Sequence, residues 1–507
     1  MKTVWNRLKL SVKPDYIGWL FIALGTVLRL RQYLADRSLW YDEANLALNL
    51  VNRTFSALTR PLDYEQGAPI VFLFIEKSIL VLLGNKDYLL RLFPLLSGLL
   101  ALYLIYLIAR QYFGTIGLFA VLVFAISWQL IYYSSELKQY SSDAMIALLL
   151  IYLAFHCIKD RVRVADFLLL GVTGLIAIWT SHPSIFILAG IGLTLTLDTL
   201  SRKAYTPLAW TLGLGVLWIA ALAAVYFVSL QYLTADTVLQ NYWRRGFMPL
   251  PPWTNLNWFG KTYLLLLDAS LGFDFRSLTI ISSALALIGG VSLLYRNRNI
   301  ALILILPFGW TLIASALQKY PLDDRLMLFL APLFILLMSE GLSWIYLFIR
   351  KWNGTMAVLI FGCIVLLTLW ALADNALQNF LAPSMGEDIK PVLQYVEKNR
   401  SPNDIVYVFH GARPSFNYYA PFYGLDTGKV ITGTDPPRAQ ALQQFYNQAN
   451  QLKGHDRVWV IFSHLVDCGG CTGNKEAFYV KYLNQFGQGE NQFQAQGANV
   501  YLYDLNP

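Results

Sequence analysis

The sequence is poor in charged residues, which make up only 14% of its 507 positions, against about 25% in a typical soluble domain. Hydrophobic residues make up 56%. A chain with so little charge does not have water as its main solvent. The composition therefore excludes an ordinary soluble globular protein and favours a chain that lies largely in a lipid bilayer.

Cysteine is also scarce, with four residues, and only one pair of them suggests redox chemistry. Cys157 and Cys363 fall in apolar tracts, whereas Cys468 and Cys471 share a glycine-rich loop with His464. That loop predicts a small disulfide, with a zinc site as the alternative. A phosphate-cradling glycine loop, an HExxH motif and a GxSxG motif are all missing, so neither cytosolic nucleotide chemistry nor serine hydrolysis has support.

Long apolar runs are abundant, and they predict about eleven transmembrane helices, each near the 20 residues that cross a bilayer. No removable signal peptide is expected, because the first run is not followed by a small-residue cleavage site. The expected spans are residues 16–34, 89–110, 115–133, 141–158, 165–181, 183–200, 206–230, 276–294, 300–318, 325–348 and 354–374.

One further apolar segment, Gly67 to Leu83, is too short to span and has Glu76-Lys77 at its centre, so we expect it to lie in the membrane interface. With this segment excluded, the basic turns between spans fall on the side of the basic N-terminus, as the positive-inside rule requires. The first loop (35–88) and the C-terminal residues then face outward, on the extracytoplasmic side of the membrane. If the segment did span, this orientation would reverse.

The composition of residues 385–507 is that of a soluble domain. Apolar runs at Ile405–Phe409, Arg457–Phe462 and Asn499–Tyr503 predict strands, and residues 387–399 predict a helix. We therefore expect a transmembrane domain (1–380) and a small extracytoplasmic α/β domain (385–507). The net charge is +8, and the lysines and arginines lie between the apolar spans. We therefore expect them to set the orientation in the membrane or to contact lipid phosphate, and not to bind nucleic acid.

The densest group of reactive residue types follows the first span, at Trp40-Tyr41-Asp42-Glu43. Adjacent residues on a helix diverge by about 100°, so only one of the two acids is expected to touch a reacting group. The helix dipole favours the ionised form of both, and an ionised carboxylate can act as a general base. The alternative is that both acids only cap a surface helix.

The other candidate residues are polar or charged and lie at the predicted outward ends of the spans, where buried charge is costly and suggests function. Arginines among them match the geometry of a phosphate group. Interface anchoring and solvated loop charge are the alternatives. The candidates for substrate binding are Glu65, Glu136, Lys138, His182, Arg244, Arg245, Tyr320 and Arg325.

Together these motifs resemble the membrane glycosyltransferases of the GT-C fold, specifically bacterial relatives of protein O-mannosyltransferases and of lipid A aminoarabinose transferase. The resemblance covers residues 15–375. It is carried by Trp40-Tyr41-Asp42-Glu43-Ala44, the non-crossing helix from Gly67, Arg91-Leu92-Phe93-Pro94 and the turn at Glu136. It implies a polytopic α-helical GT-C protein with non-spanning interfacial helices and a small C-terminal α/β domain.

The resemblance also implies an inverting glycosyltransferase that moves a sugar from a polyprenyl-phosphate carrier to an acceptor on the outer face of the membrane. Asp42 is then the catalytic base, and Lys138, Arg244, Arg245 and Arg325 stabilise the leaving phosphate. The aminoarabinose relative further suggests a divalent metal ion held by Glu65 and His182, although no cofactor is certain.

Two departures leave the donor sugar and the acceptor open. Gly67-Ala68-Pro69 stands where protein mannosyltransferases have His-Pro-Pro, and Gln66 stands where the aminoarabinose enzyme has lysine. Two other classes of function remain as alternatives: a transporter or flippase of a lipid or sugar, and a non-catalytic membrane assembly subunit. The gathering of charges at one face instead of the membrane midplane counts against transport.

Overall fold

The structure of the protein is a computed structural model that describes residues 16–159, 163–272, 276–425, 430–434, 441–465 and 475–506. Cys468 and Cys471 lie outside the described residues, so the predicted disulfide stays a prediction. The chain divides into two compact units. One, the transmembrane unit, comprises Met1–Leu34, Phe55–Leu82 and Arg91–Pro383. The other, the α/β unit, comprises Ala35–Thr54, Leu83–Leu90 and Ser384–Pro507.

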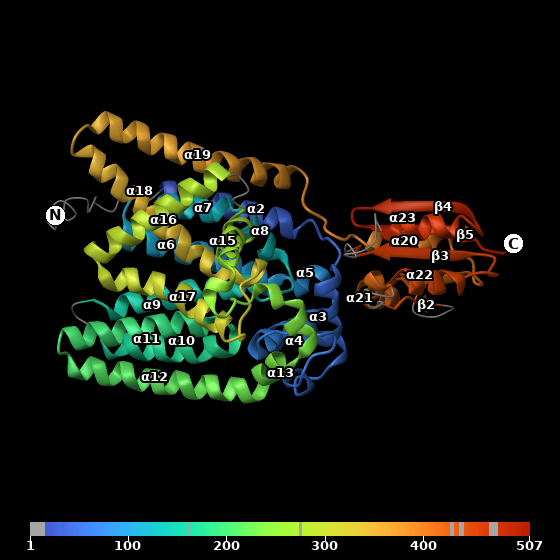
Figure 1. Cartoon of the computed structure of the whole chain (residues 1–507), viewed down its shortest axis with the longest axis horizontal. Coiled ribbons are helices and arrows are strands. Elements are labelled where there is room, and N and C mark those ends of the chain that lie inside the picture. Colours follow the sequence, from blue (N-terminus) through green and yellow to red (C-terminus); the bar gives the residue numbers. More distant parts are fainter. Residues whose placement is uncertain are drawn as a thin grey trace. The chain divides into compact units, whose positions relative to one another are not determined.

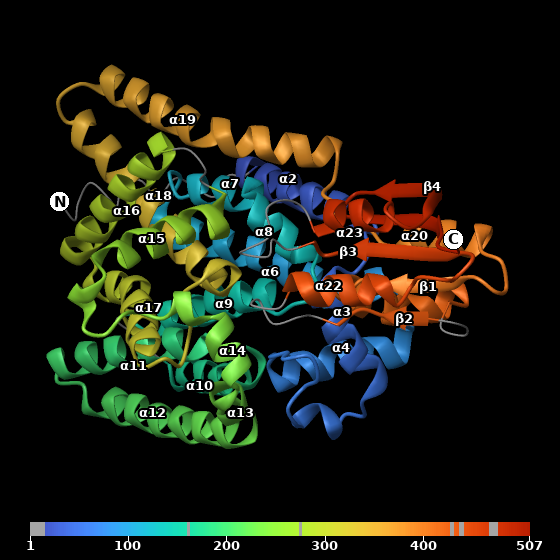
Figure 2. The same cartoon turned by 45° about the vertical axis from the view of Figure 1, so that its right-hand side comes forward.

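The transmembrane unit is built from helices that run back and forth (Figures 1 and 2). Its helices in chain order are α2 (Tyr16–Tyr33), α4 (Ile70–Leu83), α6 (Leu92–Ile108), α7 (Leu118–Ile126), α8 (Trp128–Tyr132), α9 (Tyr140–Cys157), α10 (Val164–Thr180), α11 (Ser184–Ser201), α12 (Tyr205–Val225), α13 (Gln231–Ala235), α14 (Thr237–Tyr242), α15 (Leu256–Leu271), α16 (Arg276–Arg296), α17 (Arg298–Ala316), α18 (Ala331–Arg350) and α19 (Gly354–Leu381).

Eight helices of the described residues are long and apolar enough to cross a bilayer, or nine if the α7–α8 pair, bent by 67°, forms one span. The predicted number of eleven is not confirmed. Helix α10 has only 17 residues, and α2 carries Arg29, Arg31 and Gln32 near its end. Helix α4, which the sequence excluded as a span, has 14 residues and is not among the eight.

Helices α18 and α19 show the two environments of this unit. The first 13 of the 20 residues of α18, Ala331 to Ser343, are buried, whereas α19 presents large apolar side chains such as Leu366 and Trp370, which are 71% and 80% exposed. A continuous apolar surface of this kind is stable against lipid and not against water. The protein is therefore an integral membrane protein.

The α/β unit contains a five-stranded sheet of order β2-β1-β3-β5-β4. Its strands are β1 (Ile405–Val408), β2 (Val430–Thr432), β3 (Val458–Ser463), β4 (Gln488–Ala495) and β5 (Ala498–Asp504). Strands β2, β1 and β3 are parallel, and β5 and β4 add antiparallel pairs. The strands predicted from three apolar runs are observed as β1, β3 and β5.

Helices cover both faces of this sheet. Helix α20 (Lys390–Asn399) packs Tyr395 against Trp459, and on the other face Phe445 of α22 (Ala441–Asn450) and Tyr479 of α23 (Lys475–Leu483) join Tyr407 in one core. Because both faces are covered, every residue of β1 and β3 is buried, as expected for parallel strands.

Three helical segments complete the α/β unit: α3 (Tyr41–Asn52), α5 (Asp87–Leu90) and α21 (Arg413–Tyr419). Helices α3 and α21 pack together, although more than 350 residues separate them in the chain. The sequence placed the whole of residues 35–88 with the transmembrane domain. In the structure, the part that includes Asp42 is packed in the same compact unit as the C-terminal sheet.

Candidate active site

The first turn of α3 places its two acids in different surroundings. Glu43 is fully buried, where its Oε2 accepts a hydrogen bond from the Trp40 backbone N–H (3.4 Å) and lies 4.0 Å from Arg37 Nη2. Asp42 is half-buried. Glu43 therefore closes the helix start by accepting from the backbone N–H of the N-cap residue, and Asp42 is the acid left accessible for chemistry.

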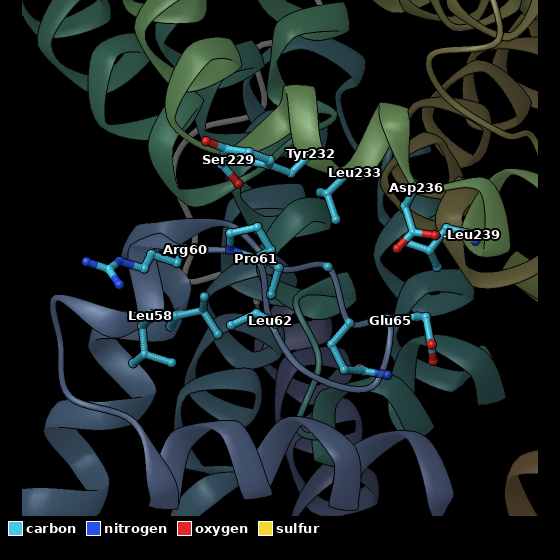
Figure 3. A pocket seen from close by; sticks show the side chains of 14 residues that line it. Leu58, Arg60, Pro61, Leu62, Glu65, Ser229, Tyr232, Leu233, Asp236 and Leu239 are labelled. Carbon is cyan, nitrogen blue, oxygen red and sulfur yellow. Dashed lines mark hydrogen bonds between the residues drawn. The ribbon is translucent and has the colours of Figure 1, made fainter.

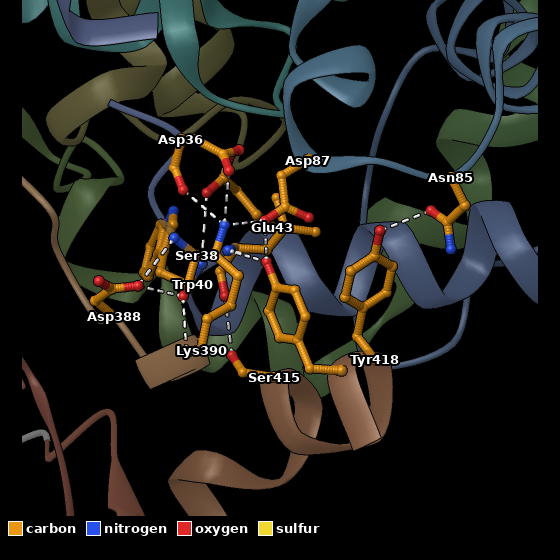
Figure 4. Close-up of polar contacts among 12 residues, drawn as sticks. Asp36, Ser38, Trp40, Glu43, Asn85, Asp87, Asp388, Lys390, Ser415 and Tyr418 are labelled. Atoms are coloured by element: carbon orange, nitrogen blue, oxygen red, sulfur yellow. Dashed lines mark hydrogen bonds and ion pairs between the residues drawn. The ribbon is translucent and has the colours of Figure 1, made fainter. Parts of the chain in front are cut away.

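A set of polar contacts, here called the loop anchor, holds residues 36–39 against the C-terminal residues (Figure 4). The Leu39 N–H donates to Tyr419 Oη (2.7 Å), which in turn donates to Asp87 Oδ2 (2.6 Å). Lys390 Nζ contacts Asp87 Oδ2 (2.8 Å) and the Asp36 carbonyl oxygen (2.6 Å). The segment that leads into Asp42 is thus fixed on several sides.

In the transmembrane unit, the turn between α8 and α9 buries charge. Glu136 is fully buried and Lys138 is 4% exposed. Lys138 Nζ donates to Gln66 Oε1 (2.6 Å), and the Gln139 side chain donates to the Gly67 carbonyl oxygen (3.4 Å). The structure therefore joins two segments that the sequence marked separately, the Glu65–Pro69 turn and the Glu136 turn.

Arg325 lies beside this turn: its guanidinium is 5.5 Å from the centre of the ring of Tyr140, the first residue of α9. Arg245 and Arg325 both act on Asp323: burial and Asp324 raise the pKa of Asp323, and the two arginines oppose that rise. The structure thus brings Lys138, Arg245 and Arg325 into one region of the transmembrane unit. We call these three residues the basic cluster.

The backbone of the Arg244–Gly246 turn is tied to the turn that carries Tyr320 and Arg325. The Leu322 N–H donates to the Gly246 carbonyl oxygen (2.7 Å), and the Trp258 indole N–H donates to the Arg245 carbonyl oxygen (2.9 Å). The side chains of Arg244 and Arg245 are exposed. Their backbone is therefore held while their guanidinium groups reach solvent.

Tyr320 and His182 are both partly buried. The Tyr320 hydroxyl donates to the Leu326 carbonyl oxygen (2.8 Å), and burial, Asp143 and Tyr140 raise its pKa. Burial lowers the pKa of His182 to about 4, so its ring is neutral at neutral pH. Its Nε2 atom has no hydrogen-bond partner among the described residues.

Glu65 lines a surface pocket together with residues of α13 and α14 (Figure 3). Tyr64 and Glu65 both adopt positive φ angles, which turn the chain sharply just before α4. Asp236 lines the same pocket and caps α14 by accepting from the Val238 N–H (2.8 Å). The pocket therefore presents two carboxylates, and only Glu65 was predicted.

Three residues of this region were not among the site residues predicted from the sequence. Asp143, in the first turn of α9, is 6% exposed and neighbours Ser181. Gln66 is the partner of Lys138, and Asp323 lies with the two arginines. The signal for Asp143 was present, since an acid inside an otherwise apolar span is costly, but the long run that surrounds it was interpreted only as a span.

The described residues contain no group of three or more His, Cys, Asp or Glu side chains placed to hold a metal ion. Glu65 and His182, which the sequence suggested as ligands, therefore do not belong to a group of three such side chains within the described residues. Metal binding by this pair stays a prediction, and no step of the chemistry below depends on it.

Comparisons with solved structures establish the fold. ArnT from Cupriavidus metallidurans matches in the apo state with a TM-score of 0.51 and 14% identity, over 96% of this chain and 98% of that one. The same protein bound to undecaprenyl phosphate gives 0.52 and 13%, over 96% and 98%. The Archaeoglobus fulgidus oligosaccharyltransferase in complex with zinc and sulfate gives 0.52 and 13%, over 95% and 72%.

These matches define the class, an integral membrane protein of the GT-C fold. Within it, residues 67–227 match the family model described as dolichyl-phosphate-mannose-protein mannosyltransferase. The resemblance to GT-C membrane glycosyltransferases that was drawn from the sequence is thereby confirmed. No curated protein matches the chain significantly.

Proposed function

We propose that the protein is an inverting glycosyltransferase that moves a sugar from a polyprenyl-phosphate carrier to an acceptor on the outer face of the membrane. Three findings support this: the mannosyltransferase family segment, the fold it shares with a transferase solved with undecaprenyl phosphate, and the accessible Asp42. The observation that carries the proposal is the last, a half-buried carboxylate in the first turn of α3, beside a glutamate already engaged in capping.

In the proposed reaction, the Asp42 carboxylate takes the proton of an acceptor hydroxyl as that oxygen attacks the anomeric carbon of the sugar. The bond between the anomeric carbon and the phosphate oxygen breaks on the opposite side, so the anomeric centre inverts. The polyprenyl phosphate leaves as an anion and needs no general acid. Its developing charge needs cations instead.

The basic cluster is suited to that second task. Arginine can donate two parallel hydrogen bonds to a phosphate, and lysine supplies a compact positive charge. Lys138, Arg245 and Arg325 are accordingly assigned to the carrier phosphate, with the exposed Arg244 as a further candidate. Glu65, Glu136, His182 and Tyr320 are assigned to substrate binding in general, because the donor sugar is not identified.

The proposed orientation follows from the basic turns between spans, which the positive-inside rule places in the cytoplasm. The C-terminal sheet would then be extracytoplasmic, in a bacterial inner membrane. An alkaline phosphatase fused after Pro507 should be active in intact cells. An inactive enzyme there, together with a fluorescent cytoplasmic reporter at the same position, would overturn this orientation.

The experiment that tests the function is mass spectrometry of polyprenyl-phosphate lipids from cells that carry the native chain, Asp42→Asn or Glu397→Gln. The Asp42→Asn change keeps the shape of the side chain and removes the base, so a glycosylated carrier should accumulate, and its mass would identify the donor sugar. Glu397→Gln changes an exposed carboxylate of α20 and should leave the lipids as in the native strain.

Identical lipid profiles in all three strains, with the variants present in the membrane at native levels, would contradict the proposal. A transporter or an assembly subunit would then be the next hypothesis. Accumulation in both variants would show an effect of reduced protein function in general, and would equally remove the support for Asp42 as the base.

A further inference from the structure

The start of α3 is capped by Glu43 at the third helical position, and no Ser, Thr, Asp or Asn stands at the N-cap. Its N-cap residue is Trp40, whose side chain makes no cap hydrogen bond, whereas Ser, Thr, Asp or Asn normally supplies an oxygen there. The first N–H groups of any helix are without partners inside it. Glu43 satisfies the N–H of Trp40, so the N–H of Tyr41, one residue before Asp42, needs a partner from outside the helix.

Glu387 supplies that partner from 346 positions away: its Oε2 accepts the Tyr41 N–H at 3.1 Å. Its other oxygen, Oε1, accepts from Nδ1 of His464 at 2.6 Å. The His464 ring stacks on the Tyr41 ring, with centres 4.2 Å apart and planes within 15°. Glu387 and His464 thus hold both the backbone and the side chain of Tyr41.

Both residues are themselves placed by close backbone packing in the α/β unit. A Cβ atom added at Gly411 would meet the His464 carbonyl oxygen at 2.6 Å, so the ends of β1 and β3 touch there. Gly497, in the turn between β4 and β5, likewise lies against the backbone of Gly386 and Glu387. His464 also adopts a positive φ of 52°, a strained conformation that packing of this kind can maintain.

The carboxyl ends of the parallel strands in an open α/β sheet are the usual place for a functional crevice. In this sheet, His464 directly follows β3, and its neighbours at that end are Tyr41 and Trp40, the latter with a ring centre at 6.2 Å. The start of α3 therefore occupies the position in which related sheets present binding residues. The loop anchor fixes the preceding residues 36–39 independently.

We propose that Glu387 and His464 are positioning residues for Asp42, so that the C-terminal part of the chain sets the geometry of the catalytic base. This inference rests on the proposed function for its consequence in catalysis, but not for the contact itself. A base acts only from the correct position, and displacement by about 1 Å can cost on the order of a hundredfold in rate. The sheet thereby contributes to sugar transfer without touching the substrate.

The test uses the purified full chain in lipid nanodiscs with the variants Glu387→Ala, Glu387→Gln and, as matched control, Glu490→Ala. Glu490 belongs to the same unit and forms an ion pair of 2.8 Å with Arg457, but that pair is exposed. The first measurement is hydrogen–deuterium exchange of residues 40–48. Glu387→Ala should speed exchange there and leave β1 and β3 protected, whereas Glu387→Gln, which keeps an acceptor oxygen, and Glu490→Ala should not.

The second measurement separates positioning from binding. Glu387→Ala should lower sugar transfer by about tenfold or more, as judged by accumulation of the glycosylated carrier in cells, and leave the affinity for undecaprenyl phosphate within about twofold. Glu387→Gln should restore most of the transfer. The His464→Phe variant keeps a ring on Tyr41 and loses the contact with Glu387, so it should show an intermediate exchange rate at residues 40–48.

Unchanged exchange at residues 40–48 in Glu387→Ala would overturn the proposal, whatever the protein transfers. A loss of protection throughout β1 and β3 in both Glu387 variants would also overturn it, since Glu387 would then stabilise the fold and not α3. If exchange responds as expected but Asp42→Asn does not change the lipids, the contact stands and the proposed function fails. The two failures are thus distinguishable.

Discussion

The two units hold distant segments together by different physical means. In the transmembrane unit, α16 and α18 approach so closely that a Cβ at Gly289 would collide with the Leu337 carbonyl oxygen, and a Cβ at Gly341 with that of Leu285. In the α/β unit, Lys390, Asp87 and Tyr419 fix the segment before Asp42 through ion pairs and hydrogen bonds.

The difference follows from the solvent of each unit. Lipid tails give no hydrophobic drive between helices, so close packing at small residues becomes the main attraction. A unit exposed to water can instead use charged groups, which solvent partly screens. In the transmembrane unit, this close packing is supplemented by an ion pair of 2.8 Å between Arg296 of α16 and Glu340 of α18. The charges of Lys138 and Arg325, which precede α9 and α18, have an explanation of their own. Ligand binding is the one proposed above.

The largest effect is expected from breaking the helix contact. Gly341→Ala places a methyl group against a backbone carbonyl that cannot move aside. The loss of unfolding free energy should therefore reach or exceed the upper end of the ~1–3 kcal/mol typical of overpacking. Thermal unfolding of the purified protein should show a lower Tm and a lower folded yield. Gly309→Ala is the matched control, because no atom lies within 4 Å of its added Cβ. Equal Tm values for the two variants would refute the close crossing.

The next effect concerns Arg325, a charged residue of the transmembrane unit that is assigned above to the carrier phosphate. Arg325→Ala should weaken binding of undecaprenyl phosphate by about tenfold to hundredfold, since a hydrogen bond to a charged group contributes about 1.5–3 kcal/mol. Binding can be measured by native mass spectrometry of the nanodisc protein. Arg202→Ala, which removes an exposed arginine and its ion pair with Asp198, should leave affinity unchanged. If Arg325→Ala lowers the Tm but leaves the affinity for undecaprenyl phosphate unchanged, Arg325 has a structural role and does not bind the phosphate.

A smaller effect is expected from the charged anchor of the α/β unit. Lys390→Met should destabilise residues 35–54 by about 1–3 kcal/mol, because it leaves Asp87 without its cation. Limited proteolysis within residues 35–54 measures this opening, with Lys398→Met on the exposed face of α20 as control. Similar cleavage rates in both variants would show that the anchor is not needed.

The pH dependence of that anchor has a defined sign. Burial works against the charged form of Lys390, but Asp87 and Asp36 outweigh it and raise the pKa above the usual 10.5. A raised lysine pKa stabilises the fold fully below 10.5, and the contribution is lost as pH rises through the higher folded value. The difference between Lys390→Met and the native protein should therefore shrink in strongly alkaline solution.

The units also differ in how far the sequence predicted them. Long apolar runs identify spanning helices from composition alone, and β1 and β3 are apolar because both of their faces are buried. Strand β4 was missed because its sequence, Gln488–Ala495, is polar, as an exposed strand at the sheet edge permits. The contacts of Glu387 and Lys138 could not be predicted, since each joins residues tens to hundreds of positions apart. Such pairs depend on tertiary packing, which local pattern does not record.

The last effect concerns His182, a partly buried side chain whose Nε2 atom has no hydrogen-bond partner among the described residues. Its pKa is lowered to about 4 by burial, from 6.5, so the folded protein binds fewer protons than the unfolded chain between these values. Stability from this group is therefore present above pH 6.5 and is lost as pH falls toward 4. The native protein should lose on the order of 1–3 kcal/mol of unfolding free energy through His182 between pH 7 and pH 4.5. His182→Gln removes this loss, so its Tm should fall less than that of the native protein over the same range. His455→Gln, in the α/β unit, is the control. If the Tm values of both variants fall with pH in parallel with that of the native protein, protonation of His182 does not destabilise the fold. The His182 ring is then solvated more fully than its burial indicates.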